Sequence, residues 1–333
     1  MQRRGFYIHM RGYPIFLFGV FFLRLFLPAE ENQGKAWQLP VPSNPKELLE
    51  IQDRLQSLLP KVQGALVSIE ANDGAGSGII VSEDGLVLTA AHVIGKSNKK
   101  MFVRLPNGKR ATAVSLGGSE LSDAGMLKIT TAGPWPFVEM APKGSSQLGD
   151  WCFGLGHPGG FDKERGLVVR LGRVIGRKDE TMRTDSRLLG GDSGGPLFDF
   201  NGRVIAIHSR ISKKPDENFH VPIESYLANW EFFQNETLFT MEKMEKGGFL
   251  GVACKEAKGG VMVVEAIKET PAESLGLQPD DLLVSIDEQK IDNREELTIL
   301  IASKNPGDEI KLEYQRDGKS MSSKIKLGKR PDE

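Results

Sequence analysis

The sequence predicts a mostly β protein, and three observations carry this prediction. The chain of 333 residues contains 38 glycines and 18 prolines that follow no period, which is typical of short strands joined by tight turns. From Val62 onward, apolar and polar residues alternate and turn signals become dense. Three pairs of strand-like segments meet at short turns in this region, so we expect antiparallel strands folded into a sandwich or barrel.

Each expected hairpin is built around a recognisable turn. The segments GSGIIVS and LVLTAAHV meet at residues 83–85, FVRL and ATAVSL meet at 107–108, and PLFDF and RVIAIHS meet at 201–202. The last two turns are Asn-Gly, the strongest short-range hairpin signal between alternating apolar runs. The sequence therefore predicts three hairpins in one segment.

The N-terminus resembles an export signal. Residues 1–29 carry several arginines, an apolar run over 14–27 and a small residue, Ala29, where a peptidase could cut. The apolar run is shorter than the roughly 20 residues of a membrane span. A cleaved signal peptide is the favoured interpretation, with a retained N-terminal anchor and a wrongly assigned start as alternatives. Each of the first two exports the rest of the chain.

Residues 30–60 are expected to form a linker and one amphipathic helix. Leucines and isoleucine recur at mixed helical spacing over 45–59, and Ser43 or Asn44 can cap the first turn.

Composition excludes several kinds of partner and cofactor. The net charge is −1 and basic residues are interleaved with acidic ones, so we expect no nucleic-acid partner. Cys152 and Cys254 fall in segments expected to belong to different domains, so both are interpreted as small buried apolar residues rather than a disulfide. Five histidines without a ligand spacing such as HExxH predict no metal and no cofactor.

Three residues far apart in the sequence supply the roles of a nucleophilic hydrolase. His92 follows a predicted strand in LTAAHV, Asp123 opens DAGMLKI, and Ser193 lies in the glycine-rich loop GGDSGGPL. A serine hydroxyl is a weak nucleophile until a histidine accepts its proton, and a carboxylate holds that imidazole in the required tautomer. The glycines allow a tight turn that aims the amides of Gly191 and Ser193 at one oxyanion. Each residue alone has a structural interpretation, but the three together favour a Ser-His-Asp hydrolase.

TAAHV, the DxxxLK pattern at Asp123 and GDSGGPL together resemble the trypsin-fold serine proteases of the HtrA/DegP family. GLGHPGGFD and RTDSRLLGGDSGGPLFDFNGRVIAIHS follow the family's pattern in order and at similar spacing. The resemblance implies two antiparallel six-stranded β-barrels over residues 61–228, with His92 and Asp123 from the first barrel and Ser193 from the second. It implies an ATP-independent endopeptidase, periplasmic or secreted, that cleaves unfolded or damaged proteins through an acyl-enzyme.

The sequence departs from the family pattern at two positions. Asp192 stands where asparagine usually precedes the nucleophile, but Asp-Ser is what trypsin-like digestive enzymes use, so activity is not in doubt. We expect the carboxylate of Asp192 to meet a local charge. His157 stands where the family often has asparagine, and for it and His208 a structural or substrate-lining role is favoured over a metal or switch role.

The family resemblance also gives a candidate S1 pocket, lined by Leu188, Ile207, His208 and Ser209. Their largely apolar character implies a small or medium aliphatic P1 residue. Arg187 occupies the position that sets charge preference in trypsin-like pockets, so an acidic P1 residue is the alternative.

Residues 247–329, after an expected helical linker over 229–246, resemble a PDZ domain of the HtrA kind. PAESLGLQPDDLLVSIDEQKI carries most of this resemblance. The resemblance implies that backbone amides of one loop hold a peptide C-terminus while the next strand accepts the peptide as an added strand. That loop consists of Gly248, Phe249, Leu250 and Gly251. A glycine-rich turn that enters an unrelated small β-domain is the alternative.

Asn293 and Glu296 form a capping box at the start of a predicted helix beside the peptide groove. Only one PDZ domain fits before the chain ends, and the sequence leaves open whether it tethers substrates or inhibits the protease until a peptide binds. The implied partners are unfolded polypeptides and peptide C-termini, and the family commonly forms homotrimers. A latent or vestigial protease that acts as a chaperone-like peptide-binding module is the alternative function, which the intact triad disfavours.

Overall fold

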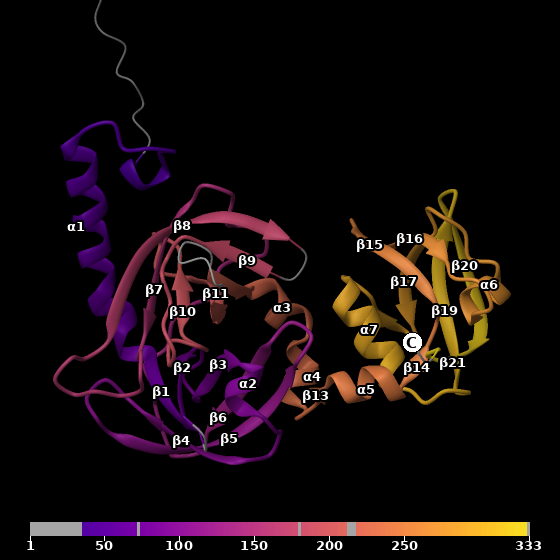
Figure 1. Cartoon of the computed structure of the whole chain (residues 1–333), viewed down its shortest axis with the longest axis horizontal. Coiled ribbons are helices and arrows are strands. Elements are labelled where there is room, and N and C mark those ends of the chain that lie inside the picture. Colours follow the sequence, from indigo (N-terminus) through magenta and orange to yellow (C-terminus); the bar gives the residue numbers. More distant parts are fainter. Residues whose placement is uncertain (1–34, 72–73, 179–180, 212–217, 332–333) are drawn as a thin grey trace, which may run out of the picture. The chain divides into compact units, whose positions relative to one another are not determined.

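The computed structural model describes residues 35–71, 74–178, 181–211 and 218–331 (Figure 1). The expected signal peptide or anchor over residues 1–29 lies outside this part. Within the described residues, no helix combines the length and the apolar character that crossing a membrane requires.

Two closed antiparallel barrels form the first part of the fold, as the resemblance implies. The first barrel contains β1 (Leu66–Ala71), β2 (Gly74–Ile80), β3 (Leu86–Ala90), β4 (Lys100–Arg104), β5 (Arg110–Ser119) and β6 (Ala124–Ile129). The strands follow the order β5-β4-β1-β2-β3-β6, and the pairing of β5 with β6 closes the barrel. The second barrel contains β7 (Trp151–Gly156), β8 (Val168–Lys178), β9 (Thr181–Thr184), β10 (Pro196–Phe198), β11 (Val204–Ile211) and β12 (Asn218–Pro222).

All three predicted hairpins are confirmed. The strand pairs β2–β3, β4–β5 and β10–β11 are antiparallel, and their last pairs before the turns are Ile80 with Val87, Arg104 with Arg110, and Phe198 with Val204. In the second barrel, the Phe153 and Phe198 rings stack with centroids 5.1 Å apart, and both side chains are fully buried. Burial of one such ring contributes about 1.5–3 kcal/mol.

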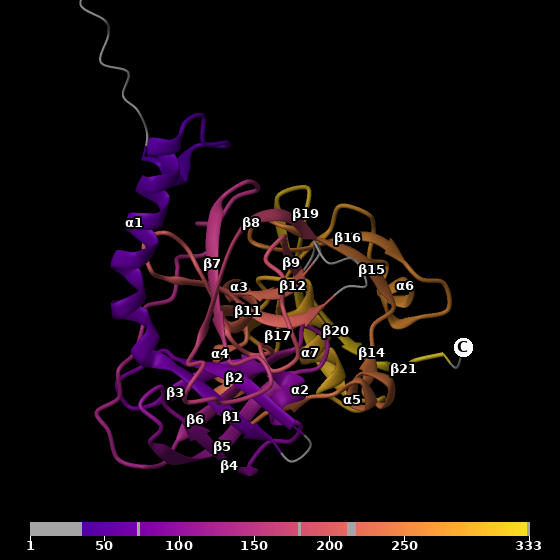
Figure 2. The ribbon, with the colours of Figure 1, turned by 60° about the vertical axis from the view of Figure 1, so that its left-hand side comes forward.

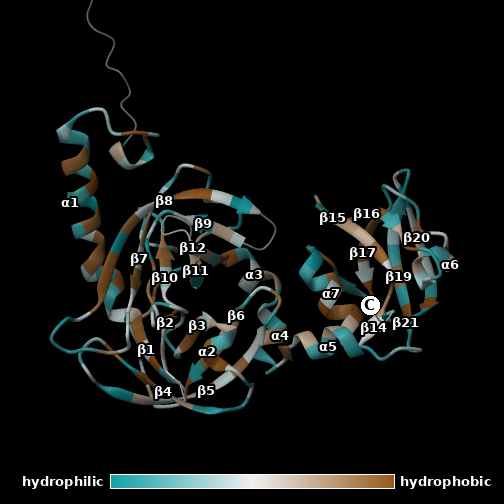
Figure 3. Ribbon diagram, in the orientation of Figure 1, coloured by the Kyte–Doolittle hydropathy of each residue, from teal (hydrophilic) through white to brown (hydrophobic). Residues whose placement is uncertain are grey.

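The predicted amphipathic helix is confirmed as α1 (Pro45–Val62), three residues longer than expected. Asn44 is its cap, since its Oδ1 accepts the amide of Glu47 at 3.1 Å. Hydrophobic and hydrophilic residues alternate along α1 (Figure 3), and the buried ones are Ile51, Leu58 and Val62. The helix lies beside the second barrel in both views (Figures 1 and 2).

The prediction of a helical linker over residues 229–246 is wrong for the residues in the middle of this segment. Two short helices, α4 (Trp230–Gln234) and α5 (Met241–Lys246), flank a strand, β13 (Leu238–Phe239). This strand pairs in parallel with Gly118 and Ser119 of β5 and makes the sheet of the first barrel seven-stranded. Leu238 is buried in the hydrophobic core that includes the first barrel, and Phe239 is also buried. This burial outweighs the local helical pattern.

The C-terminal part is a small α+β domain. Its main sheet contains β15 (Val252–Ala257), β16 (Gly260–Ala266), β17 (Leu282–Ile286), β19 (Glu309–Arg316) and β20 (Lys319–Lys326), in that order, and β18 (Gln289–Lys290) pairs with β17. The strands β14 (Gly248–Phe249) and β21 (Gly328–Lys329) form a separate pair. The helices are α6 (Pro271–Leu275) and α7 (Arg294–Ala302).

The capping box predicted at α7 is present with a small change. Asn293 Oδ1 accepts the amide of Glu296 at 2.9 Å, as expected. The Glu296 carboxylate accepts the amide of Asp292 at 2.5 Å, one residue earlier than the reciprocal bond of a standard capping box.

Candidate active site

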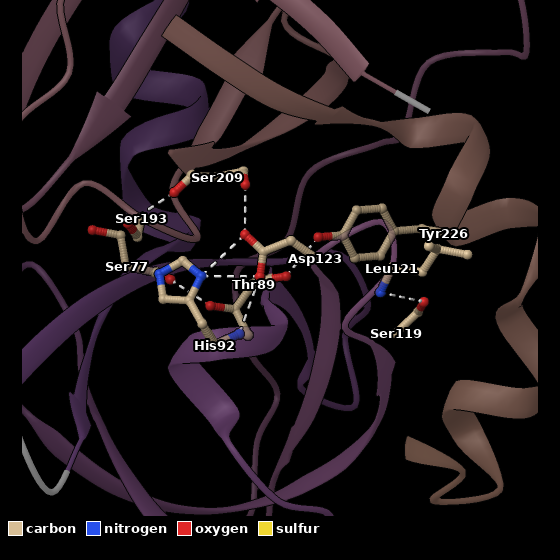
Figure 4. A network of polar contacts seen from close by, with 9 residues as sticks. All are labelled: Ser77, Thr89, His92, Ser119, Leu121, Asp123, Ser193, Ser209 and Tyr226. Atoms are coloured by element: carbon tan, nitrogen blue, oxygen red, sulfur yellow. Dashed lines mark hydrogen bonds and ion pairs between the residues drawn. The ribbon is translucent and has the colours of Figure 1, made fainter. Parts of the chain in front are cut away.

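The three candidate catalytic residues come from both barrels and meet at one place (Figure 4). His92 lies in the single turn α2 (Ala91–Ile94) directly after β3, and Asp123 directly precedes β6. Asp123 has a φ of 64°, and its carbonyl accepts the amide of Ala91 at 2.9 Å. Ser193 lies in the loop between β9 and β10. The pairing of β3 with β6 thus places His92 and Asp123 side by side.

The imidazole of His92 is oriented by Asp123. His92 Nδ1 lies 2.9 Å from Asp123 Oδ1 and 3.0 Å from Oδ2, which leaves Nε2 on the opposite edge of the ring. The hydrogen bond that His92 makes to the Asp123 carboxylate raises the pKa of His92, and partial burial opposes the rise. Figure 4 shows the imidazole with the Asp123 carboxylate on one side and Ser193 on the other. The arrangement is that of a base whose free nitrogen is available to a nucleophile.

Ser209 contacts both Asp123 and Ser193, which sequence reasoning missed. Its hydroxyl donates to Asp123 Oδ2 at 2.5 Å, so it helps to fix the carboxylate. Its carbonyl accepts the Ser193 hydroxyl at 3.1 Å. Within the described residues, the hydroxyl of Ser193 is therefore bonded to Ser209 and not to His92.

Ser77 of β2 binds the loop that carries the nucleophile, although from the sequence it was expected only to lie in a strand. Its amide donates to Ser193 O and its hydroxyl donates to Gly191 O, both at 2.8 Å. The same hydroxyl accepts the amide of His157 at 3.0 Å. Its position between glycines, in AGSGII, was the available signal, because a small polar residue there can be approached closely by another backbone.

Gly191 requires a conformation that only glycine adopts easily. Its φ is 96°, and an added Cβ would lie 2.5 Å from Gly159 N and 2.6 Å from His157 O. In the glycine-rich turn expected at the nucleophile, a glycine at position 191 is thus needed both for its positive φ and because there is no room for a side chain.

A cavity of about 410 Å³ lies beside the nucleophile. Its lining consists of Gly74, Ala75, Gly76, His92, Val93, Ile94, Gly95, Lys99, Gly191 and Ser193. The residues expected at the S1 pocket lie outside this lining and are buried: Leu188, Ile207, His208 and Ser209. Arg187, which carried the alternative of an acidic P1 residue, is exposed.

His208 faces the interior of the second barrel. Its Nδ1 lies 3.0 Å from Nδ1 of His220, whose Nε2 lies 2.7 Å from Thr184 Oγ1. Burial lowers the pKa of His220 to about 3 and, with the neighbouring His220 and Arg170, holds the pKa of His208 well below its usual range. The backbone of His208 pairs with Gly194 and Gly195 at 2.7 Å. These buried contacts favour a structural role for both histidines.

His157 is also buried, and burial followed by the charge of Arg165 lowers its pKa to about 4. Neither ring nitrogen has a hydrogen-bond partner within the described residues. That part of the chain contains no group of three or more His, Cys, Asp or Glu side chains able to hold a metal. Cys152 and Cys254 are both free, the first buried and the second half-buried.

The second candidate site is a groove in the C-terminal domain. The four residues of the expected carboxylate loop line a cavity of about 260 Å³ together with Val252, Ala253, Cys254, Arg294, Leu297, Thr298, Ile301, Ala302 and Arg330. The groove therefore runs between β15 and α7, and β15 is the last strand at that end of its sheet. An edge strand beside a helix can accept an extended peptide by strand addition.

Comparisons with known proteins agree with this architecture. A family model described as a trypsin-like peptidase domain matches residues 76–207, and one described as a PDZ domain matches residues 248–327. The fold and the site thus define a trypsin-like peptidase domain joined to a PDZ domain. In sequence the chain is similar to the HtrA/DegP family of such serine proteases.

Similar curated proteins include two named "Probable periplasmic serine endoprotease DegP-like". The one from Hahella chejuensis is 30% identical over 276 residues, and the one from Ectopseudomonas mendocina is 29% identical over 278 residues. The alignments cover 77% and 78% of this chain and 57% of each relative, so the chain spans little more than half of their length. Among solved structures, the HtrA-type protease AlgW with tripeptide shares the fold, with a TM-score of 0.57, 23% identity and coverage of 84% of this chain and 98% of AlgW.

Proposed function

We propose that this chain is a serine endopeptidase with Ser193 as nucleophile, His92 as general base and Asp123 as the residue that orients the base. The observation that carries the proposal is the bond between His92 Nδ1 and Asp123 at 2.9 Å, in a site where His92 and Ser193 line the same cavity. The amides of Gly191 and Ser193 are the proposed oxyanion donors.

The reaction follows from these roles. Ser193 Oγ attacks the scissile carbonyl carbon while His92 Nε2 takes the hydroxyl proton, and the carbonyl oxygen becomes the oxyanion. His92 then gives the proton to the leaving amine as the C–N bond breaks, which leaves an acyl-enzyme. Water then attacks the acyl carbon while His92 Nε2 takes its proton. The bond to Ser193 Oγ breaks, His92 returns the proton to Ser193, and the carboxylic acid product is released. The hydroxyl of Ser193 must leave the Ser209 carbonyl before the first step, because it has only one proton to donate.

The second part of the proposal concerns substrates. The groove between β15 and α7 is proposed to bind peptide C-termini, with the amides of Gly248, Phe249, Leu250 and Gly251 holding the carboxylate. The proposed substrates are unfolded exported proteins, whose C-termini are extended and accessible. AlgW structures that contain a decapeptide or a tripeptide support peptide binding in this family. We place the protease domain over residues 61–228 and the PDZ domain over 247–329.

The proposed location is the periplasm. The two curated relatives are named periplasmic, and the N-terminal 29 residues have the pattern of an export signal. A homotrimer is the proposed assembly, because the family commonly forms trimers, and analytical ultracentrifugation of the purified chain tests it.

The decisive experiment labels the purified chain with a fluorophosphonate and measures casein cleavage. Ser193→Ala should abolish labelling and lower kcat by about 10⁴- to 10⁶-fold. Ser57→Ala is the matched control, because this exposed serine lies on α1 and bonds only within its own helix. Equal labelling of Ser193→Ala and the unmodified chain would refute the assignment. A folded unmodified chain that neither labels nor cleaves would favour the chaperone-like alternative.

A further inference from the structure

The residue before the nucleophile carries a buried charge. The side chain of Asp192 is 1% exposed, and its Oδ2 accepts three hydrogen bonds. Two come from Arg170 of β8, from Nη2 at 2.5 Å and Nε at 3.1 Å, and the third comes from the amide of Leu189 at 2.8 Å. The charge that the sequence led us to expect beside Asp192 is therefore the guanidinium of Arg170.

The position of Arg170 follows from strand register. Arg170 pairs with Gly154 of β7, and Val168 pairs with Gly156 two residues further along that strand. An added Cβ on Gly156 would lie 2.3 Å from Asp192 Oδ1, so the carboxylate occupies the space that this glycine leaves open. The missing side chain on β7 thus makes room for the ion pair beneath the nucleophile loop.

Asp192 also closes the loop through its backbone. Its amide donates to Leu189 O at 3.0 Å, and its carbonyl accepts the amide of Gly195 at 2.8 Å. The residue therefore has bonds on both sides of Ser193. We therefore expect a rearrangement around the Asp192 side chain to shift Gly191 and Ser193, whose amides are the proposed oxyanion donors.

We propose that Arg170 is a positioning residue for catalysis, which acts through Asp192 to hold the loop of the nucleophile and the oxyanion donors. The inference rests on the proposed endopeptidase function. Arg170 is 14% exposed and its partner is 1% exposed, so removal of the cation leaves a carboxylate stranded away from water. A stranded buried charge is far more costly than the loss of both partners together. The loop would have to rearrange to hydrate the carboxylate.

The test is a cycle of four full-length proteins: the unmodified chain, R170Q, D192N and R170Q/D192N. In R170Q, kcat for a peptide substrate should fall by about 10²-fold, the size of one lost oxyanion donor, while KM changes little. Asparagine can still accept the Leu189 amide, so D192N should stay within about 10-fold of the unmodified chain. In the D192N background, R170Q should change kcat by less than about 3-fold, because no charge is left to strand.

R177Q is the matched control. Arg177 lies on the same strand and pairs with Glu224 at 2.9 Å, away from the nucleophile loop, so its loss should leave kcat unchanged. A loss of about 10²-fold on adding R170Q to D192N would overturn the proposal, since Arg170 would then act by another route. So would an R170Q protein with kcat within about 3-fold of the unmodified chain.

Two further measurements keep the inference testable. If R170Q alone does not fold, the comparison of D192N with the double variant still decides the question. Thermal unfolding of the same proteins measures the coupling of the two side chains without turnover. Additive shifts in melting temperature would overturn the inference, whatever the catalytic activity of the unmodified chain.

Discussion

The hydroxyl of Ser77 donates to the carbonyl of Gly191 at 2.8 Å, and this bond joins β2 of the first barrel to the nucleophile loop of the second. The amide of Ser77 makes a parallel bond to Ser193 O. Because His92 and Asp123 come from the first barrel, these two bonds set the position of the nucleophile relative to its base. Ser77 itself is held by Thr89 Oγ1, which donates to its carbonyl at 2.8 Å.

Ser77→Ala should lower kcat by about 5- to 10-fold with little change in KM. One hydrogen bond contributes about 1 kcal/mol, and here that energy holds the loop in its reactive position. Ser68→Ala is the control, because Ser68 is equally buried in the same barrel but lies on β1. Steady-state kinetics with a peptide substrate measure the effect, and a rise in KM at constant kcat would contradict the positioning role.

The rate should fall on the acid side as His92 becomes protonated. Asp123 raises the pKa of His92, so the imidazole keeps its proton to a higher pH than an isolated histidine would and cannot act as a base until that pKa is passed. Asp123→Asn removes the carboxylate that raises the pKa of His92, so the acid limb of the kcat/KM profile should move to lower pH. The maximum of kcat/KM should fall by about 10⁴-fold. Rate profiles between about pH 5 and 9 test this, and an unmoved limb would count against Asp123 as the cause.

Gly251→Ala should weaken the binding of a C-terminal peptide by at least about 10-fold. Gly251 has a φ of 81°, and an added Cβ would lie 2.3 Å from Thr270 Cβ and Oγ1, so the carboxylate loop would have to shift. Gly259→Ala is the control: its φ is 88°, but nothing lies within 4 Å of the added atom, so it has the backbone strain without the clash. Fluorescence anisotropy with a labelled peptide measures both, and equal losses would show that strain alone is responsible.

Leu58→Ala should destabilise the chain by about 2–5 kcal/mol, since this side chain of α1 is 2% exposed and its removal leaves a cavity. Leu48→Ala on the same helix is the control, because Leu48 is 54% exposed. Urea unfolding followed by tryptophan fluorescence compares the two. Similar midpoints for both variants would mean that α1 is not packed on the protein in solution.

Local sequence signals predicted the features that depend on neighbouring residues. Asn201 and Gly202 close a hairpin, Asn44 caps α1, and the glycines around Ser193 permit its turn, and each signal is confined to a few residues. The adjacency of His92 and Asp123 is a long-range feature, and the family resemblance supplied it.

Features that depend on register between distant segments could not be predicted in this way. Arg170 meets Asp192 only because β7 and β8 pair in one register and Gly156 leaves space. On β11, every residue from Val204 to Ser209 is buried, so the period-two rule could not show that the His208 side chain points into the barrel. The two-residue strand β13 is too short to have any period.

The pairing of β13 with β5 also determines where the protease can be separated from the PDZ domain. A chain that ends at residue 228 would lack Leu238 and Phe239 and would leave the backbone of Gly118 and Glu120 without its bonds to Thr237 O and Phe239 O. The bare strand edge would be open to pairing with other molecules, so such a fragment should self-associate. A fragment that keeps residues up to Lys246 retains that cover, so β13 stabilises the sheet of the first barrel although it lies outside residues 61–228.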